Sequence, residues 1–220
     1  MPKPKHFTNK SDLISTLKRL PSIIGMKFHA VEPNLVLLVR KSVGRSTFRG
    51  LPTKKRRPSA VFREWAYERL ADEKTLAQLS VVKTHEDYDR WIKRLSSDLR
   101  PRWEKETGQV MRFGPSRKLP DLLMKEVIRW SGFTAGHRNQ LLEFIHVPLD
   151  SYSLLAVRRC LSDTKAGRRV KISDNASMGS VGTEGMYASI QKAIREIAEE
   201  AGVPPIYIDL LAWNRTHKAV

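Results

Sequence analysis

The chain has 220 residues, of which 40% are hydrophobic, which is enough for one compact unit with a substantial core. Its 40 lysines and arginines against 23 aspartates and glutamates give a formal net charge of +17, far more than solubility requires, so we expect a polyanionic partner and most simply nucleic acid. A membrane-surface protein is disfavoured, because the sequence has no long apolar run, no lysine-faced amphipathic helix at either end and no lipidation motif.

Residues 1–59 are predicted to form a basic N-terminal region. Residues 11–20 place apolar side chains on one helical face behind Ser11, the expected cap. Residues 26–42 contain two stretches rich in Val and Leu around a Glu-Pro-Asn turn at 32–34, a pattern that predicts a small β-hairpin. Residues 44–59 combine Gly, Pro and Ser with many basic residues and predict an exposed loop, whose run Lys54, Lys55, Arg56 and Arg57 is either a clamp on a DNA backbone or a solvated loop.

From residue 60 onward the apolar pattern is helical. A short stripe begins at Phe62, and a capping-box pattern at 84–87 precedes a longer stripe that ends near Pro101 or shortly beyond it. A third stripe starts at Leu119, with Pro120 placed in the first turn of its helix, where proline is tolerated.

The last third of the chain continues this pattern. Residues 131–140 predict a loop followed by the start of another helix, and residues 164–182 predict a basic loop. A strong amphipathic helix covers residues 187–201, and Gly202 ends it. The sequence therefore predicts a mainly α protein, with residues 60–220 as one compact helical region.

Cysteine and histidine usage limits the chemistry. The N-terminal segment lacks the apolar core of a secretory signal and Cys160 is the only cysteine, so we expect a cytoplasmic protein without disulfides. The six histidines show no HExxH-type or His-x-His pairing, and we expect neither a metal ion nor a cofactor. Phosphate-binding loops of the GxxxxGK[ST] and GxGxxG types and a GxSxG nucleophile motif are also absent from the sequence.

Two residues carry candidate chemistry. Lys118 leads the helix predicted from residue 119, and Asp150 lies where an N-cap is expected. A lysine amine can attack C1′ of a nucleoside and leave a Schiff base with the opened sugar, if a carboxylate manages the proton and the developing positive charge. Burial, the adjacent Arg117 and the positive end of the helix would favour the neutral amine. Spacing alone nevertheless favours a simpler interpretation, in which Asp150 is a structural cap worth about 1 kcal/mol and Lys118 a phosphate contact or a solvated charge.

The surrounding motifs shift that balance. The order RKLPDLLMKEV (117–127), a loop and short helix, and HVPLDSYSLLAVRR (146–159) resembles the catalytic half of the helix-hairpin-helix DNA glycosylase superfamily. It is most similar to the archaeal 8-oxoguanine DNA glycosylase branch, in which a lysine-led helix is followed by a Pro-hydrophobic-Asp turn that opens the next helix. The similarity covers about residues 60–215, including the DLLAW turn at 209–213.

The resemblance implies a helical DNA-glycosylase-like bundle that flips a damaged or modified base out of duplex DNA. It also implies Lys118 as the Schiff-base nucleophile and Asp150 as the catalytic carboxylate. The chain departs from the superfamily in its glycine-rich hairpin, for which Gly132 and Gly136 are poorly placed, and in residues 1–59, which have no counterpart. Lys125 on the same helix is a rival nucleophile.

Residues that flank these turns are the expected DNA contacts. In addition to the basic run at 54–57, we expect phosphate contacts from Arg117, Arg138, Arg158 and Arg159. Four aromatic residues near the candidate turns could stack on a base, although helical spacing favours a core role for each of them: Phe113, Trp130, Tyr152 and Trp213.

Three functions remain open from the sequence. The first is a DNA glycosylase, with or without lyase activity. The second is a base-modifying transferase on the same scaffold, as in superfamily relatives linked to phage thymine hypermodification. The third is a non-enzymatic DNA-binding protein, in which the basic run at 54–57 would carry the affinity. In each case we expect a nucleoid-associated monomer, because so much like charge opposes self-association.

Overall fold

The computed structural model describes residues 7–20, 28–44, 46–48, 51 and 54–217. Within these ranges the chain forms ten α-helices and two short 3-10 turns and contains no β-strand, so the prediction of a mainly α protein is confirmed. A single parallel bridge between Glu32 and Trp130 is the β-type pairing found in these ranges. No helix in the described part of the chain is both long and apolar enough to cross a membrane.

The chain divides into two compact units, and each is described by itself. The first unit contains residues 1–27 and 146–220, and the second contains residues 28–145. The division therefore does not follow the boundary predicted at residue 59. The first described helix belongs to the same unit as the C-terminal part of the chain. This helix, α1 (Lys10–Lys18), packs against α10 (Glu184–Ala201), and the Lys10 ammonium lies 2.5 Å from the Glu200 carboxylate.

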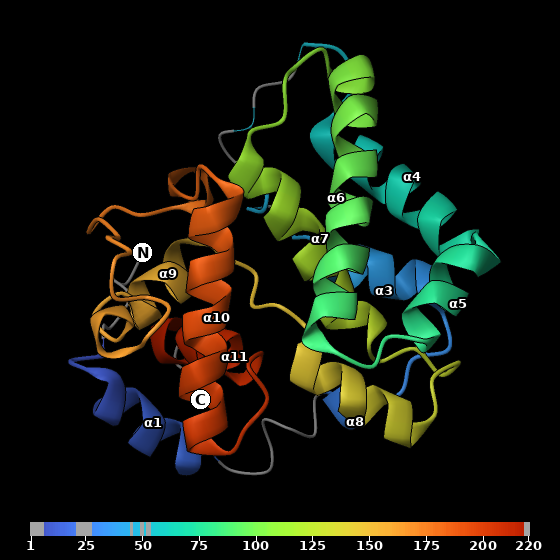
Figure 1. The fold of residues 1–220 in the computed structure, drawn as a ribbon. Coiled ribbons are helices and arrows are strands. Elements are labelled where there is room, and N and C mark those ends of the chain that lie inside the picture. The colour runs from blue at the N-terminus through green and yellow to red at the C-terminus, as the bar shows by residue number, and fades with distance from the viewer. Residues whose placement is uncertain (1–6, 21–27, 45, 49–50, 52–53, 218–220) are drawn as a thin grey trace. The chain divides into compact units, whose positions relative to one another are not determined.

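The first unit is built around α10 (Figure 1). The helix α9 (Ser151–Val157) packs against α11 (Tyr207–His217), and the segment between α9 and α10 contains the 3-10 turns η1 (Leu161–Asp163) and η2 (Met178–Ser180). The predicted end of α10 is confirmed, since Gly202 adopts a left-handed conformation with φ of 69°. The predicted cap of α1 is wrong: Asn9, not Ser11, accepts a hydrogen bond from the backbone N–H of Asp12 at 2.9 Å.

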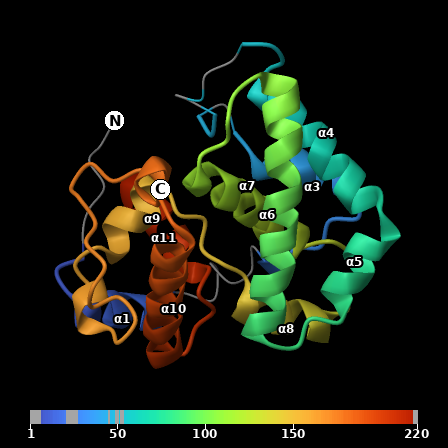
Figure 2. The same cartoon turned by 45° about the horizontal axis from the view of Figure 1, so that its top comes forward.

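The second unit is organised by its longest helix, α6 (His85–Thr107). In both views α6 lies between α4 (Pro58–Ala71) and α7 (Phe113–Val127), and both helices pack against it (Figures 1 and 2). The unit is completed by α3 (Leu35–Ser42), α5 (Glu73–Ser80) and α8 (Ala135–Phe144). Thr84 caps α6 as predicted, and the six apolar residues of its stripe are all buried: Tyr88, Trp91, Ile92, Leu95, Leu99 and Trp103.

The predicted β-hairpin at residues 26–42 is wrong where the structure describes it. Residues 35–42 form α3, and residues 26 and 27 lie outside the described ranges. Asn34 is the reason, because its side chain accepts a hydrogen bond from the N–H of Leu37 at 3.1 Å and caps a helix. Asparagine suits turns and helix caps equally well. Leu38 and Val39 are then fully buried, and α3 packs on α7, which outweighs the weak strand preference of valine.

The start of α7 was also predicted incorrectly. The helix begins at Phe113, so Lys118 lies in its second turn and not at its entrance, and Pro120 lies inside the helix. Gly114 and Pro115, which resemble turn residues in the sequence, occupy the first turn. A proline there is tolerated because the first N–H groups of a helix have no partner within it.

Candidate functional site

Lys118 is buried in the second unit. Its side chain is only 9% exposed, and among the described lysines it is the one that is buried. The helix α7 packs against α3 and α6, and every residue from Gly114 to Asp121 in its first half is buried. A buried lysine is uncommon, because desolvation of an ammonium group is costly.

Arg117 shares this environment. Its guanidinium lies over the Phe113 ring, 5.6 Å from the ring centre, and Nη1 is 3.4 Å from the hydroxyl of Ser96 on α6. Arg117 is only 4% exposed. These contacts hold the Arg117 guanidinium in place next to Lys118 in the sequence. Arg117 therefore has a structural role in addition to any contact with DNA.

Asp121 was not among the residues singled out from the sequence. It is fully buried and lies three residues after Lys118, on the same face of α7. The signal was present in the sequence as a Lys-x-x-Asp spacing within a helical pattern. A carboxylate at this position can hold the Lys118 amine in place or exchange a proton with it.

Lys125 remains on the same helix as a rival nucleophile. It lies seven residues, or about two turns, beyond Lys118 and is half-buried. Its greater exposure makes it the more ordinary lysine of the two.

Asp150 lies in the first unit and caps α9 as predicted. Its carboxylate accepts hydrogen bonds from the N–H groups of Tyr152 at 2.9 Å and Ser153 at 3.1 Å, and the Ser153 hydroxyl accepts one from the N–H of Asp150 at 2.9 Å. Asp150 is only 6% exposed. The simpler interpretation of this residue, a structural N-cap, is therefore confirmed, and it does not conflict with a second role for the carboxylate.

A buried amide fixes the segment that leads to Asp150. Gln191 on α10 accepts a hydrogen bond from the Val147 N–H at 3.2 Å and donates one to the Val147 carbonyl at 2.8 Å. One residue earlier, His146 Nδ1 lies 2.9 Å from the hydroxyl of Tyr187 on the same helix. These partners were not identified from the sequence, because the amphipathic pattern of α10 gives no indication of which buried side chains face residues 146–150.

The predicted phosphate contacts occupy different environments. Arg138 is 6% exposed and donates hydrogen bonds to the carbonyls of Ile128 and Phe133, both at 3.1 Å, so its guanidinium has a structural role in the loop before α8. Arg158 forms an ion pair with Asp174. Arg159 is exposed, and its role as a phosphate contact stays a prediction.

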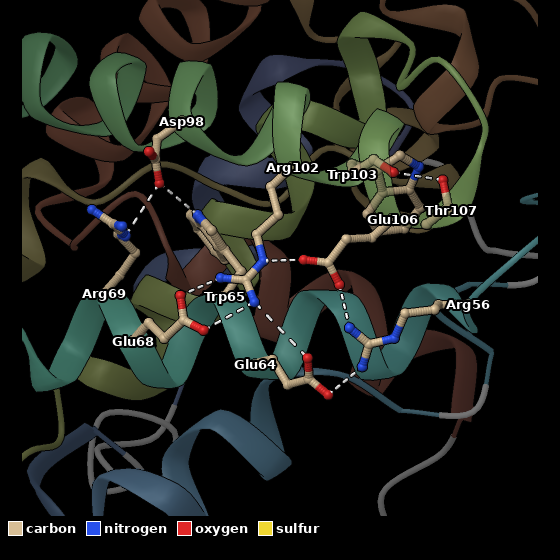
Figure 3. A network of polar contacts seen from close by, with 10 residues as sticks. All are labelled: Arg56, Glu64, Trp65, Glu68, Arg69, Asp98, Arg102, Trp103, Glu106 and Thr107. Carbon is tan, nitrogen blue, oxygen red and sulfur yellow. Dashed lines mark hydrogen bonds and ion pairs between the residues drawn. The ribbon is translucent and has the colours of Figure 1, made fainter.

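The basic run at 54–57 is fixed on the end of α6. The N–H groups of Lys54 and Lys55 donate to the Thr107 carbonyl at 3.4 and 3.2 Å, and all four side chains of the run are exposed. Arg56 differs from the other three residues of the run, because its guanidinium forms ion pairs with Glu64 and Glu106 (Figure 3). These contacts raise the pKa of Arg56, mainly through the hydrogen bond with Glu64.

The same network joins α4 to α6. Arg102 bonds to Glu68 and, through Nε at 2.7 Å, to Glu106, and its hydrogen bond lowers the pKa of the Glu68 carboxyl (Figure 3). Arg56 therefore helps to position the loop, which leaves Lys54, Lys55 and Arg57 as the residues of the run whose charges face solvent.

All four aromatic residues near the candidate turns have contacts within their own unit. Phe113 lies under Arg117, Trp130 packs on Phe133 with ring centres 5.3 Å apart, and Tyr152 packs on Trp213 at 4.9 Å. Tyr152 and Trp213 are each half-buried, so this pair presents partly open ring surface next to the Asp150 cap.

No group of three or more His, Cys, Asp or Glu side chains in the described ranges is arranged to hold a metal ion. Comparison of the chain with protein-family models, with curated proteins and with solved structures found no match.

Proposed function

We propose that the protein is a DNA glycosylase, in which Lys118 attacks the sugar of a flipped nucleotide and Asp150 is the catalytic carboxylate. The observation that carries the proposal is the burial of Lys118, the one buried lysine among those described, at the position where the motif order implies a nucleophile. Burial of an ammonium group is costly, and a functional role is a common reason for a protein to retain it.

The proposed reaction begins with the base outside the stack, because C1′ is hard to reach within a duplex. The neutral amine of Lys118 forms a bond to C1′, and the N-glycosidic bond breaks with its electron pair leaving on the base, which takes up a proton. The nitrogen loses a proton, and the C1′–O4′ bond breaks with its electron pair leaving on O4′, which takes up a proton. The nitrogen lone pair then forms the C1′=Nζ bond of a protonated Schiff base. The Asp150 carboxylate stabilises the positive charge that develops on the sugar and exchanges the proton.

The side chains around the two residues suit these roles. Two N–H groups hold Asp150 Oδ1 at the start of α9, and Gln191 holds the preceding segment, so the carboxylate is preorganised. Lys118 is buried, with Arg117 and Asp121 as neighbours along α7.

Borohydride trapping tests the proposal. Duplexes that carry 8-oxoguanine, uracil, 5-hydroxymethyluracil or an abasic site are incubated with the wild type and with Lys118→Gln, Lys125→Gln and Asp150→Asn. Lys93→Gln, an exposed residue of α6, is the matched control. We expect a covalent adduct and free base with one of the damaged duplexes, loss of the adduct in Lys118→Gln, and no loss in Lys125→Gln or in the control.

Other results would contradict the proposal in different ways. Full base release by Lys118→Gln would remove the assigned nucleophile, and loss of the adduct only in Lys125→Gln would transfer its role to Lys125. Added mass on the DNA without free base would indicate a transferase. Salt-sensitive binding with neither product would indicate a non-enzymatic DNA-binding protein.

A further inference from the structure

The first unit contains a basic cavity outside the candidate site. It has a volume of about 640 Å³ and lies between the loop 165–171 and the first two turns of α10. Its basic lining consists of four residues, which we call the basic cavity cluster: Lys165, Arg168, Arg169 and Lys171. None of them is among the DNA contacts expected from the motif order.

The loop that carries the cluster has a fixed conformation. The carboxylate of Glu196 on α10 accepts hydrogen bonds from the N–H groups of Lys165 at 2.8 Å and Ala166 at 3.1 Å. The Thr164 hydroxyl accepts one from the Gly167 N–H at 2.9 Å and donates to the Leu161 carbonyl at 2.7 Å. The cations of the cluster therefore project from a backbone that is already ordered, so binding requires little further ordering of this segment.

A close approach at Gly167 makes this turn compact. A Cβ atom at this position would lie 2.7 Å from the Leu161 carbonyl oxygen and 2.7 Å from the Thr164 hydroxyl oxygen. Only glycine fits here without displacing the backbone.

The cluster forms no ion pair within the described ranges, and its charge is least offset at Arg169 and Lys171, because Lys165 and Arg168 also line a neighbouring cavity with four acidic residues: Asp163, Glu196, Glu199 and Glu200. All four residues of the cluster are exposed, and none of their side chains forms an ion pair with a described residue, in contrast to Arg158 and Arg102. Of these four carboxylates, that of Glu196 accepts the backbone N–H groups of Lys165 and Ala166. The N-terminal end of the 18-residue helix α10 adds the positive end of its dipole, partly offset by Glu184 in the first turn.

We propose that the basic cavity cluster binds consecutive phosphates of a DNA strand. The inference rests on the proposed function in taking DNA as the polyanion. A cavity of this volume accepts a phosphate–sugar segment and not only a single ion, and clustered, unpaired arginines on a rigid loop suit phosphate oxygens. The unit that contains Asp150 therefore binds the DNA backbone through contacts of its own.

Salt-dependent binding to an undamaged duplex tests this site. The variant Arg168→Gln/Arg169→Gln/Lys171→Gln removes three charges, and Lys83→Gln/Lys93→Gln/Lys105→Gln removes three exposed charges from the second unit as the matched control. Each lost phosphate contact lowers the slope of log Kd against log salt by about 1. We expect the slope to fall by about 2 to 3 and the affinity at low salt to fall at least about tenfold in the cavity variant, and a slope change below about 1 in the control.

Equal slopes and affinities for the two triple variants would overturn the inference, as would a wild type that does not bind duplex DNA. Circular dichroism melting shows whether the triple variant is folded. If it is not, the single variant Lys171→Gln takes its place, with an expected decrease in slope of about 1. This assay uses undamaged DNA and does not measure base release. Trapping and base release that are retained in Lys118→Gln, together with the expected result for the cavity variant, would therefore contradict the catalytic proposal alone.

Discussion

Asp150 and Ser153 cap each other at the start of α9. The Asp150 carboxylate accepts the Ser153 N–H at 3.1 Å, and the Ser153 hydroxyl accepts the Asp150 N–H at 2.9 Å. The proposed catalytic carboxylate is therefore also a structural cap, and a substitution can affect stability, catalysis or both. The two roles can be separated because asparagine caps a helix as well as aspartate does but lacks the negative charge.

We expect Asp150→Asn to retain stability and lose activity. The amide oxygen of asparagine can accept the same two N–H groups, so the free energy of unfolding should stay within about 0.5 kcal/mol of the wild type, whereas Asp150→Ala should lose about 1 to 2 kcal/mol. Base release by Asp150→Asn should fall by about 100-fold or more, because charge stabilisation is lost. Urea unfolding and single-turnover base release measure the two effects, and an Asp150→Asn variant with wild-type base release would leave Asp150 as a cap alone.

Arg138 should be required for stability and not for DNA binding. Its buried guanidinium donates to the carbonyls of Ile128 and Phe133, and these acceptors would lose their partner in Arg138→Gln. We expect a loss of about 2 to 4 kcal/mol in the free energy of unfolding, measured in urea. Gln140→Ala, an exposed site on the same helix, is the control and should change stability by less than about 0.5 kcal/mol. A stable Arg138→Gln protein with weakened DNA binding would instead support the phosphate contact expected from the sequence.

Within the basic run, Lys54 and Lys55 should act differently from Arg56. Arg56 is 46% exposed and paired with two glutamates, so Arg56→Gln should change both the urea midpoint and the salt slope little. Lys54→Gln/Lys55→Gln should leave the urea midpoint unchanged and reduce the salt slope by about 2. The same duplex titration measures both variants. An unchanged slope in the double-lysine variant would show that this run is a solvated loop.

Gly167→Ala should disturb the loop that carries the basic cavity cluster. The added Cβ would lie 2.7 Å from a backbone oxygen, so the backbone must shift, and we expect a loss of about 1 to 3 kcal/mol and weaker duplex binding. Gly136→Ala is the control, because a Cβ there meets nothing within 4 Å and alanine favours the helix. Thermal unfolding and duplex titration check both variants. A Gly167→Ala protein as stable as the wild type would show that the turn can relax.

Stability should decline at alkaline pH because of Cys160. Burial raises the pKa of the Cys160 thiol from 9.0 to about 12, so between these values the unfolded chain loses a proton that the folded protein keeps. The folded state then binds more protons than the unfolded state, and the free energy of unfolding must fall as pH rises; the decrease from this thiol is about 1 kcal/mol between pH 9 and 10. Urea unfolding of the wild type and Cys160→Ala at both pH values isolates the effect. Parallel pH dependence in the two proteins would contradict it.

The sequence by itself determined most of the helices and their buried faces. The stripes that became α4, α6 and α10 and the caps at Thr84 and Asp150 were readable because a helix repeats every 3.6 residues and its ends require local partners. These signals depend on neighbours within a few positions, so they remain valid whatever the rest of the chain does.

Only the tertiary structure decided which charged residues are buried and which parts of the chain belong together. Asn34 suits a turn or a cap, and the packing of α3 on α7 selected the cap. Lys118, Asp121 and Arg138 look like other charged helix residues in the sequence, and their burial follows from which helices cover them. The basic cavity cluster likewise exists only because the loop 165–171 is fixed by Glu196, about thirty positions later in the chain. Such contacts leave no periodic trace in the sequence, since each depends on where distant segments lie in the folded chain.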